Sequence, residues 1–196
     1  MKKPGTLLKS QRERIVRTAA RLFAQRGYHA VGMTELQDAV HLGRGALYHH
    51  IRSKEDLLFD IAREYISDLA DDASAAQQQA DARERVRLLG RHLVQKIASH
   101  QAELTVCFRE VQSLTDARHA EVMALHARYE HAWREAFELG AAQGHFRPYD
   151  AIVLKGVLGM YFYSYLWMRP DRAMSPDDIS LRFNDMALRM LARDPT

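Results

Sequence analysis

Helical periodicity is the feature that most limits the fold of this 196-residue chain. Apolar residues recur at spacings of three and four along most of its length, and no stretch alternates apolar and polar residues as a half-buried strand does. The first such pattern is expected to begin at Ser10, which forms a capping box with Glu13, and to end at Gly27. The chain is therefore expected to be all-α.

Two short helices come next, at about residues 33–40 and 44–50, with the turn His41-Leu42-Gly43 between them. Ser53 then caps a longer helix, with Asp56 at its third position. Two short helices joined by a tight turn form a helix-turn-helix, in which the second helix can enter the major groove of DNA. The same shape also occurs as a plain packing corner, so spacing alone leaves the role open.

Charge is distributed unevenly along the chain. Residues 1–54 carry 11 Lys and Arg but only 3 acidic residues, whereas the remainder has a net charge of −5. A basic head on an acidic body favours contact with a polyanion such as nucleic acid. A solvated basic tail is the other explanation of the same charge pattern.

The residues of this head form a recognisable string. Phe23 precedes Gly27-Tyr28, and later comes Arg44-Gly45-Ala46-Leu47-Tyr48-His49-His50-Ile51-Arg52-Ser53-Lys54-Glu55-Asp56-Leu57. This string resembles the N-terminal domain of the TetR family over about residues 10–60. The resemblance implies a three-helix helix-turn-helix DNA-binding domain, expected at residues 8–54, and a larger helical effector-binding and dimerisation domain at 55–196.

The resemblance also implies which residues contact double-stranded operator DNA. The expected contacts are Thr34, Arg44, Gly45, Ala46, Tyr48, His49 and Lys54. Their chemistry suits the roles, because arginine reaches guanine edges or phosphate, the alanine methyl meets a thymine methyl, and hydroxyl and ammonium groups bind phosphate. Leu47 is expected to point into the core instead.

Three positions depart from the family pattern. His41 and Gly43 stand where the family usually has glycine and serine, and Gly32 stands where it tends to have threonine or serine. These changes remove a flexible turn residue, an N-cap hydroxyl and a phosphate contact. They bear on which DNA sequence is preferred, not on whether DNA is bound.

Five further helices are expected, at about residues 82–99, 102–113, 117–143, 151–168 and 176–193. The fourth is apolar almost all round, so that one side can face its own core and another a partner. We expect the last two helices to pair with their copies in a homodimer, although a monomer with a thicker core fits the same pattern. The expected interface residues are Leu154, Leu158, Phe162, Tyr165, Phe183, Met186 and Met190.

A small-molecule effector is implied by the family. The candidate lining residues are Phe108, Met123, Tyr129, Trp133 and Tyr161, although an aromatic stripe at helical spacing is also what a plain core contains. The segment around residues 165–183 loosely resembles TetR members that sense acyl-CoA thioesters. An acyl-CoA is therefore one candidate effector, and a drug-like apolar molecule is another.

Other classes of protein lack support in the sequence. There is no P-loop, dinucleotide fingerprint, G-x-S-x-G or H-E-x-x-H motif, so no enzyme and no cofactor is expected. His119, His126 and His131 are not spaced as metal ligands, and Cys107 has no thiol partner. The longest uninterrupted apolar run, 156–168, is short for a membrane span, and a single cysteine fits the reducing cytoplasm. The expectation is a ligand-released repressor, with a helical adaptor as the alternative.

Overall fold

The computed structural model describes residues 4–168 and 174–193. Within these ranges the secondary structure is helical, as expected, and it divides into two compact units. The first unit contains residues 1–65 and 102–123, and the second contains 66–101 and 124–196. The sequence did not predict that a segment beyond residue 100 belongs to the same unit as the helix-turn-helix.

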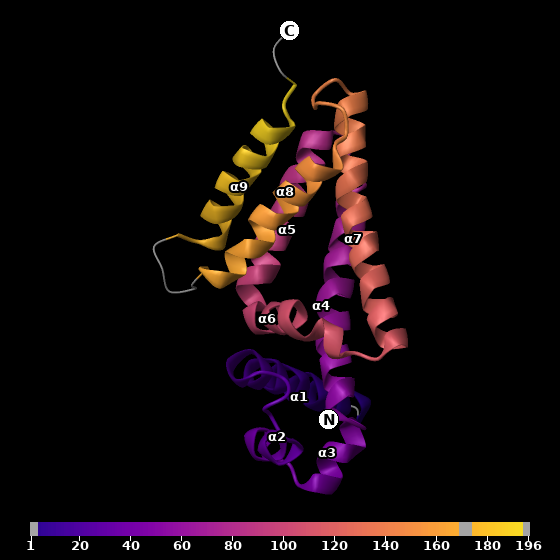
Figure 1. Ribbon diagram of the computed structural model, residues 1–196, viewed down its shortest axis with the longest axis vertical. Coiled ribbons are helices and arrows are strands. Elements are labelled where there is room, and N and C mark those ends of the chain that lie inside the picture. The colour runs from indigo at the N-terminus through magenta and orange to yellow at the C-terminus, as the bar shows by residue number, and fades with distance from the viewer. Residues whose placement is uncertain (1–3, 169–173, 194–196) are drawn as a thin grey trace. The chain divides into compact units, whose positions relative to one another are not determined.

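Figure 1 labels the helices in chain order. The bounds are α1 Pro4–Arg26, α2 Met33–Val40, α3 Arg44–His50, α4 Lys54–Ala76, α5 Ala82–Ser99, α6 Gln101–Glu110, α7 Asp116–Ala142, α8 Ala151–Tyr163 and α9 Pro176–Leu191, with 3₁₀ turns at Val111–Ser113 and Ser164–Leu166. The expected ranges match these bounds to within a few residues, except that α1 begins at Pro4 rather than at Ser10 and that α8 ends at Tyr163 rather than at residue 168. Proline is well accommodated in the first turn of a helix, so the chain can become helical before Ser10 is reached.

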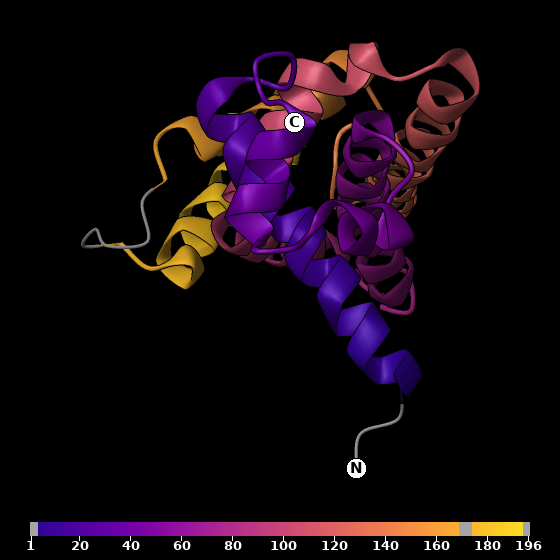
Figure 2. The ribbon, with the colours of Figure 1, turned by 90° about the horizontal axis from the view of Figure 1, so that it is seen from below.

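The first unit is built around α1, α2, α3 and the start of α4 (Figure 2). Its core consists of buried apolar side chains, namely Ile15, Val16, Ala19, Phe23, Leu36, Val40, Leu47, Leu57, Leu58 and Ile61. Gly27 ends α1 with a φ of +88°, a conformation that side-chain-bearing residues rarely adopt. Leu47 is fully buried, as expected, so the opposite face of α3 is turned outward.

The second unit packs α5, α8 and α9 against one another (Figure 1). Each of these helices begins at a side-chain cap, which satisfies backbone amides that would otherwise lack partners. Asp81 caps α5, Asp150 caps α8, and Ser175 forms a capping box with Asp178 at the start of α9. Gly90 lets α5 approach its neighbours closely, because a Cβ there would overlap the side chains of Asn184 and Tyr161.

No helix among the described residues is long and apolar enough to cross a membrane. The helix expected over 151–168 ends its α-helical part at Tyr163 and continues as a single 3₁₀ turn. Ser164, inside that turn, is completely buried.

Candidate nucleic-acid interface

The start of α4 is held by a reciprocal cap. The hydroxyl oxygen of Ser53 accepts the backbone N–H of Asp56 at 3.1 Å, and a carboxylate oxygen of Asp56 accepts the N–H of Ser53 at 3.0 Å. The same carboxylate oxygen accepts the N–H of Arg52 at 2.8 Å. This arrangement confirms the cap expected from the sequence, and it fixes how the chain passes from α3 into α4.

The outer face of α3 carries the side chains expected to contact DNA. Arg44, Ala46, Tyr48 and His49 are exposed there, and Thr34 is exposed on α2. The Arg44 guanidinium lies over the ring of Tyr48, with 5.8 Å between its central carbon and the ring centroid. The helix-turn-helix thus presents a cation, a hydroxyl and an imidazole on one side of a short helix.

Gly45 lies in the middle of this face. A Cβ built there would meet no other atom within 4 Å, and the backbone is helical. Nothing in the packing of the described residues therefore requires glycine at this position. Glycine inside a helix costs about 1 kcal/mol relative to alanine, so its presence needs another explanation.

Lys54 behaves differently from the other expected contacts. Its side chain is partly buried, and its ammonium group donates to the backbone carbonyls of Tyr28 at 2.8 Å and Val31 at 3.1 Å. The carbonyl of His29 lies at 3.5 Å. The ammonium group thus contacts the turn between α1 and α2, a contact that the local sequence gives no way to foresee.

The turn between α2 and α3 shows the effect of the departure from the family pattern. His41 adopts a left-handed conformation, with φ of 53° and ψ of 46°. Gly43 serves as the N-cap of α3 without a side-chain hydrogen bond, and Gly32 does the same for α2. The turn is therefore formed as expected, but without the glycine and the hydroxyls that would favour it.

Residues 102–123 extend the first unit. The carboxylate of Glu110 accepts the backbone N–H of Tyr28 at 3.3 Å, and the carboxylate of Glu55 accepts the N–H of Thr115 at 3.0 Å. Arg118 forms an ion pair with Asp56, and its guanidinium lies 5.2 Å from the ring centroid of Phe59. Although burial works against its charged form, the hydrogen bonds from Arg118 and from the amides of Arg52 and Ser53 hold the pKa of Asp56 below its ordinary value.

The candidate effector residues fall in two groups. Tyr129, Trp133 and Tyr161 belong to the second unit and are buried, with 5.5 Å between the ring centroids of Trp133 and Tyr161. Phe108 and Met123 belong to the first unit and are exposed.

Polar atoms are buried among the aromatic rings of the second unit. The Tyr161 hydroxyl donates to Asn184 Oδ1 at 2.7 Å. The Tyr129 hydroxyl and the Trp133 indole N–H are both buried, and the indole N–H lies close enough to the hydroxyl to act on its pKa. Apart from each other, neither group has a hydrogen-bond partner among the described residues. Burial raises the pKa of the hydroxyls of Tyr129 and Tyr161, so both groups are neutral donors at physiological pH.

A separate hollow of about 300 Å³ in the second unit is lined by Gln95, Ala98, Ser99, Gln101, Met168, Met174 and Pro176. None of the effector residues expected from the sequence belongs to it. The part of the chain that the structure describes contains no group of three or more potential metal ligands.

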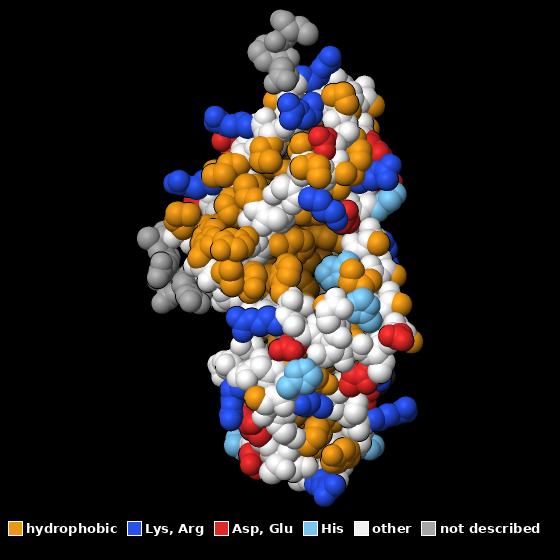
Figure 3. Space-filling model, viewed as in Figure 1, with side chains coloured by type: hydrophobic (Ala, Val, Ile, Leu, Met, Phe, Trp, Pro, Cys, Tyr) orange, Lys and Arg blue, Asp and Glu red, His pale blue; other side chains and the backbone are white. Residues whose placement is uncertain are grey.

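The expected dimer residues divide by exposure. Leu154 and Leu158 are buried in the core of their own chain, Phe162, Tyr165 and Phe183 are half-buried, and Met186 and Met190 are exposed. The most exposed large apolar residues of α8 and α9 lie outside the expected interface set: Ile152, Tyr163 and Leu181. Figure 3 shows hydrophobic side chains, coloured orange, gathered over the part of the surface where α8 and α9 lie.

Comparison with known proteins gives two family matches. Residues 15–61 match the model of the bacterial regulatory proteins of the tetR family, and residues 79–191 match the model of the tetracyclin repressor-like C-terminal domain. The transcriptional repressor KstR2 of Mycobacterium tuberculosis is 24% identical over 189 residues, covering 94% of each chain.

Two solved structures are similar over nearly their whole length. PfmR, a TetR-family regulator from Thermus thermophilus, has a TM-score of 0.84 and 30% identity, covering 91% of this chain and 99% of its own. AibR, solved in complex with isovaleryl coenzyme A and operator DNA, has a TM-score of 0.79 and 30% identity, covering 93% of this chain and 98% of its own. The helix-turn-helix, the helical second unit and these matches agree: the chain belongs to the TetR family of helix-turn-helix transcriptional repressors, which are regulators and not enzymes.

Proposed function

We propose that the protein is a homodimeric repressor that binds a palindromic operator through α3 and leaves it when a small-molecule effector binds in the second unit. The observation that carries the DNA-binding part is Gly45. No packing contact among the described residues requires glycine at this position. The residue nevertheless lies on an exposed helix face, between Arg44 and Ala46. Close approach of a DNA groove to this helix accounts for a glycine that the protein itself does not need.

The neighbouring side chains supply the contacts. Arg44 reaches a guanine edge or a phosphate, and the Ala46 methyl meets a thymine methyl. The hydroxyls of Thr34 and Tyr48 and the imidazole of His49 bind phosphate oxygens, which fix the register of the helix on the duplex. AibR, the similar structure solved with operator DNA, supports this reading of the unit. A regulator of this kind meets chromosomal DNA in the cytoplasm.

A second copy of the chain is the proposed occupant of the apolar surface on α8 and α9. Ile152 is 78% exposed, Leu181 73% and Tyr163 65%, which is unusual for such large apolar side chains on two adjacent helices. A two-fold pairing of these helices covers the surface and sets two copies of α3 one helical turn of DNA apart. Light scattering should give the mass of a dimer for the wild type, and Leu181→Glu should shift it toward the monomer.

The proposed effector is an acyl-CoA thioester bound beside Tyr129 and Trp133. Apart from each other, the Tyr129 hydroxyl and the Trp133 indole N–H have no partner among the described residues, and a buried donor without an acceptor is costly. An acceptor on a bound molecule, such as a thioester carbonyl, would satisfy them. AibR, which was solved with isovaleryl coenzyme A, supports this choice of class. A drug-like apolar molecule is the other candidate, and calorimetry with acyl-CoAs, free coenzyme A and apolar drugs separates the two.

The decisive experiment for DNA binding is selection from a pool of genomic fragments at moderate salt, followed by sequencing of the retained DNA. A specific repressor enriches a few fragments that share a short palindrome, and an acyl-CoA then releases them. Arg44→Ala should relax the preference at one base pair while leaving the rest of the palindrome intact. A folded dimer that retains no sequence, with or without acyl-CoA, would instead support the helical adaptor.

A further inference from the structure

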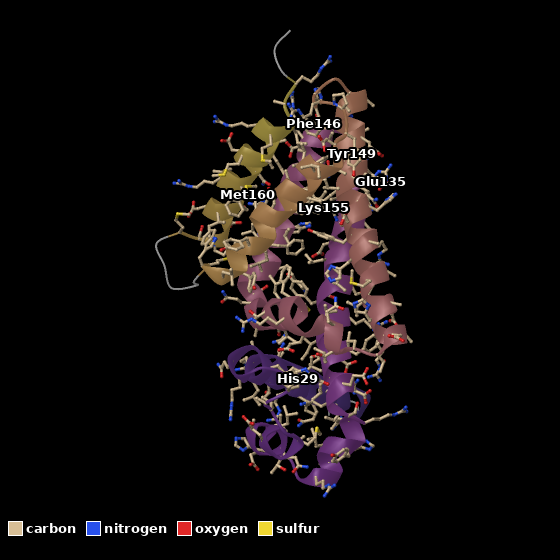
Figure 4. All side chains as sticks on the ribbon, viewed as in Figure 1. His29, Glu135, Phe146, Tyr149, Lys155 and Met160 are labelled. Atoms are coloured by element: carbon tan, nitrogen blue, oxygen red, sulfur yellow. The ribbon has the colours of Figure 1, made fainter. Side chains whose placement is uncertain are left out.

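The turn that joins α1 to α2 spans residues 27–32, and its two ends are bonded to the helices through the Gly27 N–H and the Gly32 carbonyl. Among the described residues, no backbone amide pairs with the carbonyls of Tyr28, His29 or Val31. Val31 is fully buried and Tyr28 nearly so, and buried carbonyls are normally paired. His29 of this turn is labelled in Figure 4.

Lys54 supplies the missing donors. A lysine ammonium has three N–H donors and no acceptor, and the three carbonyls lie at 2.8, 3.1 and 3.5 Å from its nitrogen. The ring of Tyr28 covers the same group, with 4.4 Å between the nitrogen and the ring centroid. The three carbonyls and this ring form what we call the carbonyl cage, in which three carbonyl acceptors face the three N–H donors of the ammonium group.

The cage closes the helix-turn-helix. Lys54 is the first residue of α4, which is separated from the end of α3 by three residues, and the caged turn leads directly into α2 through its N-cap Gly32. Its side chain therefore links the two ends of the segment that carries α2 and α3. Since Thr34 and the α3 residues are all in that segment, the cage fixes the relative placement of the groups proposed to contact DNA.

We infer that the Lys54 side chain is a positioning group of the DNA-binding unit, and that its ammonium stays in the carbonyl cage rather than neutralising a phosphate. This inference rests on the proposed DNA binding. It assigns the Lys54 ammonium to holding the turn between α1 and α2 in place of the phosphate contact expected from the sequence. The backbone N–H of Lys54, at the start of α4, is not affected by the cage. To reach a phosphate, the ammonium would have to leave three carbonyls that have no other backbone partner among the described residues.

Salt dependence separates the two roles. Each phosphate contact contributes about one unit to the slope of log affinity against log salt concentration. Anisotropy titrations of a labelled duplex, selected as described above, should show that Lys54→Met weakens binding about tenfold, since a loosened contact surface must be ordered on binding. The slope should stay that of the wild type. A slope lower by about one unit would overturn the inference, and so would wild-type affinity.

Lys54→Arg provides the conservative comparison. The planar guanidinium is too large for a cage built for an ammonium group, but it binds phosphate at least as well. We therefore expect Lys54→Arg to weaken binding as Lys54→Met does, with the slope unchanged. Restoration of wild-type affinity by arginine would identify a phosphate contact. Arg128→Met, which removes an exposed cation of α7 paired with Asp71 at 2.7 Å, is the matched control and should bind as the wild type does.

A measurement on the unaltered protein does not depend on how the variants fold. Amine-selective acetylation of the free wild type, read by mass spectrometry, should label Lys54 much more slowly in the native protein than in the urea-unfolded chain, because three carbonyls occupy the donors of Lys54. Fast labelling of Lys54 in the free protein, with protection only on adding DNA, would refute the cage. If the wild type binds no duplex, the proposed function fails while the acetylation pattern still reports on the cage.

Discussion

Substitution of Gly90 by alanine should disrupt the core of the second unit. A Cβ at this position would lie 2.1 Å from Oδ1 of Asn184 and 2.4 Å from the hydroxyl of Tyr161. These two atoms hydrogen-bond to each other, and the Asn184 amide also donates to the Arg87 carbonyl at 3.1 Å. Tyr161 cannot move aside, because its buried ring is in contact with the rings of Trp133 and Phe183.

The size of the effect follows from three contributions. Leaving the buried partners of the Tyr161–Asn184 hydrogen bond unpaired costs about 1–3 kcal/mol. Forcing an extra methyl group into a packed core costs about 1–3 kcal/mol. Replacing a helical glycine by alanine returns about 1 kcal/mol. We therefore expect Gly90→Ala to lower the free energy of unfolding by about 3 kcal/mol and Tm by roughly 6–12 °C for a chain of this length.

Urea unfolding followed by tryptophan fluorescence measures this change, because Trp133 lies beside Tyr161. The protein concentration must be the same for all variants, since dimerisation makes the apparent stability depend on it. Gly45→Ala is the control: its backbone is helical, and an added Cβ meets nothing within 4 Å, so the change should be stabilising and stay within about 1 kcal/mol. An equally small change for Gly90→Ala would refute the close approach of α5 to Asn184 and Tyr161.

Three further predictions concern the first unit. His41→Gly should stabilise the protein by about 0.5–1 kcal/mol in urea unfolding, because the left-handed conformation costs a residue with a side chain about 1–2 kcal/mol, and the greater backbone entropy of unfolded glycine offsets part of the gain. A loss of stability would contradict this. Burial raises the pKa of the Cys107 thiol from 9.0 to about 12, so a thiol reagent at neutral pH should modify the native protein about a thousandfold more slowly than the urea-unfolded chain. Equal rates would show that the thiol is accessible to solvent in the native protein. The pKa of Asp56 is lowered in the folded state, so its contribution to stability is fully present above about pH 4 and is lost as the pH falls further. The difference in urea midpoint between the wild type and Asp56→Asn should therefore shrink with falling pH, whereas a difference that grows in acid would reverse this assignment.

Local signals in the sequence predicted most of the fold. The Ser53–Asp56 cap and the end of α1 at Gly27 each depend on residues a few positions apart, and the structure forms both. The start of α1 was missed because the capping box at Ser10 is a pattern that a longer helix can also contain.

Contacts between distant residues were not predictable in the same way. Lys54 meets carbonyls that lie 23 to 26 positions earlier in the chain, and a periodicity argument cannot specify such a pairing. The burial of Leu154 and Leu158 depends on which side of α8 faces the core. Because α8 is apolar on almost all sides, its sequence does not distinguish the buried side from the exposed one. The exposed face of α3 was predicted because its family string is specific and Leu47 marks the inner side.

The membership of residues 102–123 in the first unit has a consequence for recombination between relatives. The bonds from Thr115 to Glu55 and from Arg118 to Asp56 join the start of α4 to a segment encoded some 60 codons later. A chimera that takes its helix-turn-helix from this chain and everything after residue 60 from another family member would break these pairs. A working exchange of operator preference must therefore carry two separate pieces of coding sequence, the head and the segment around residues 102–123, into the recipient together.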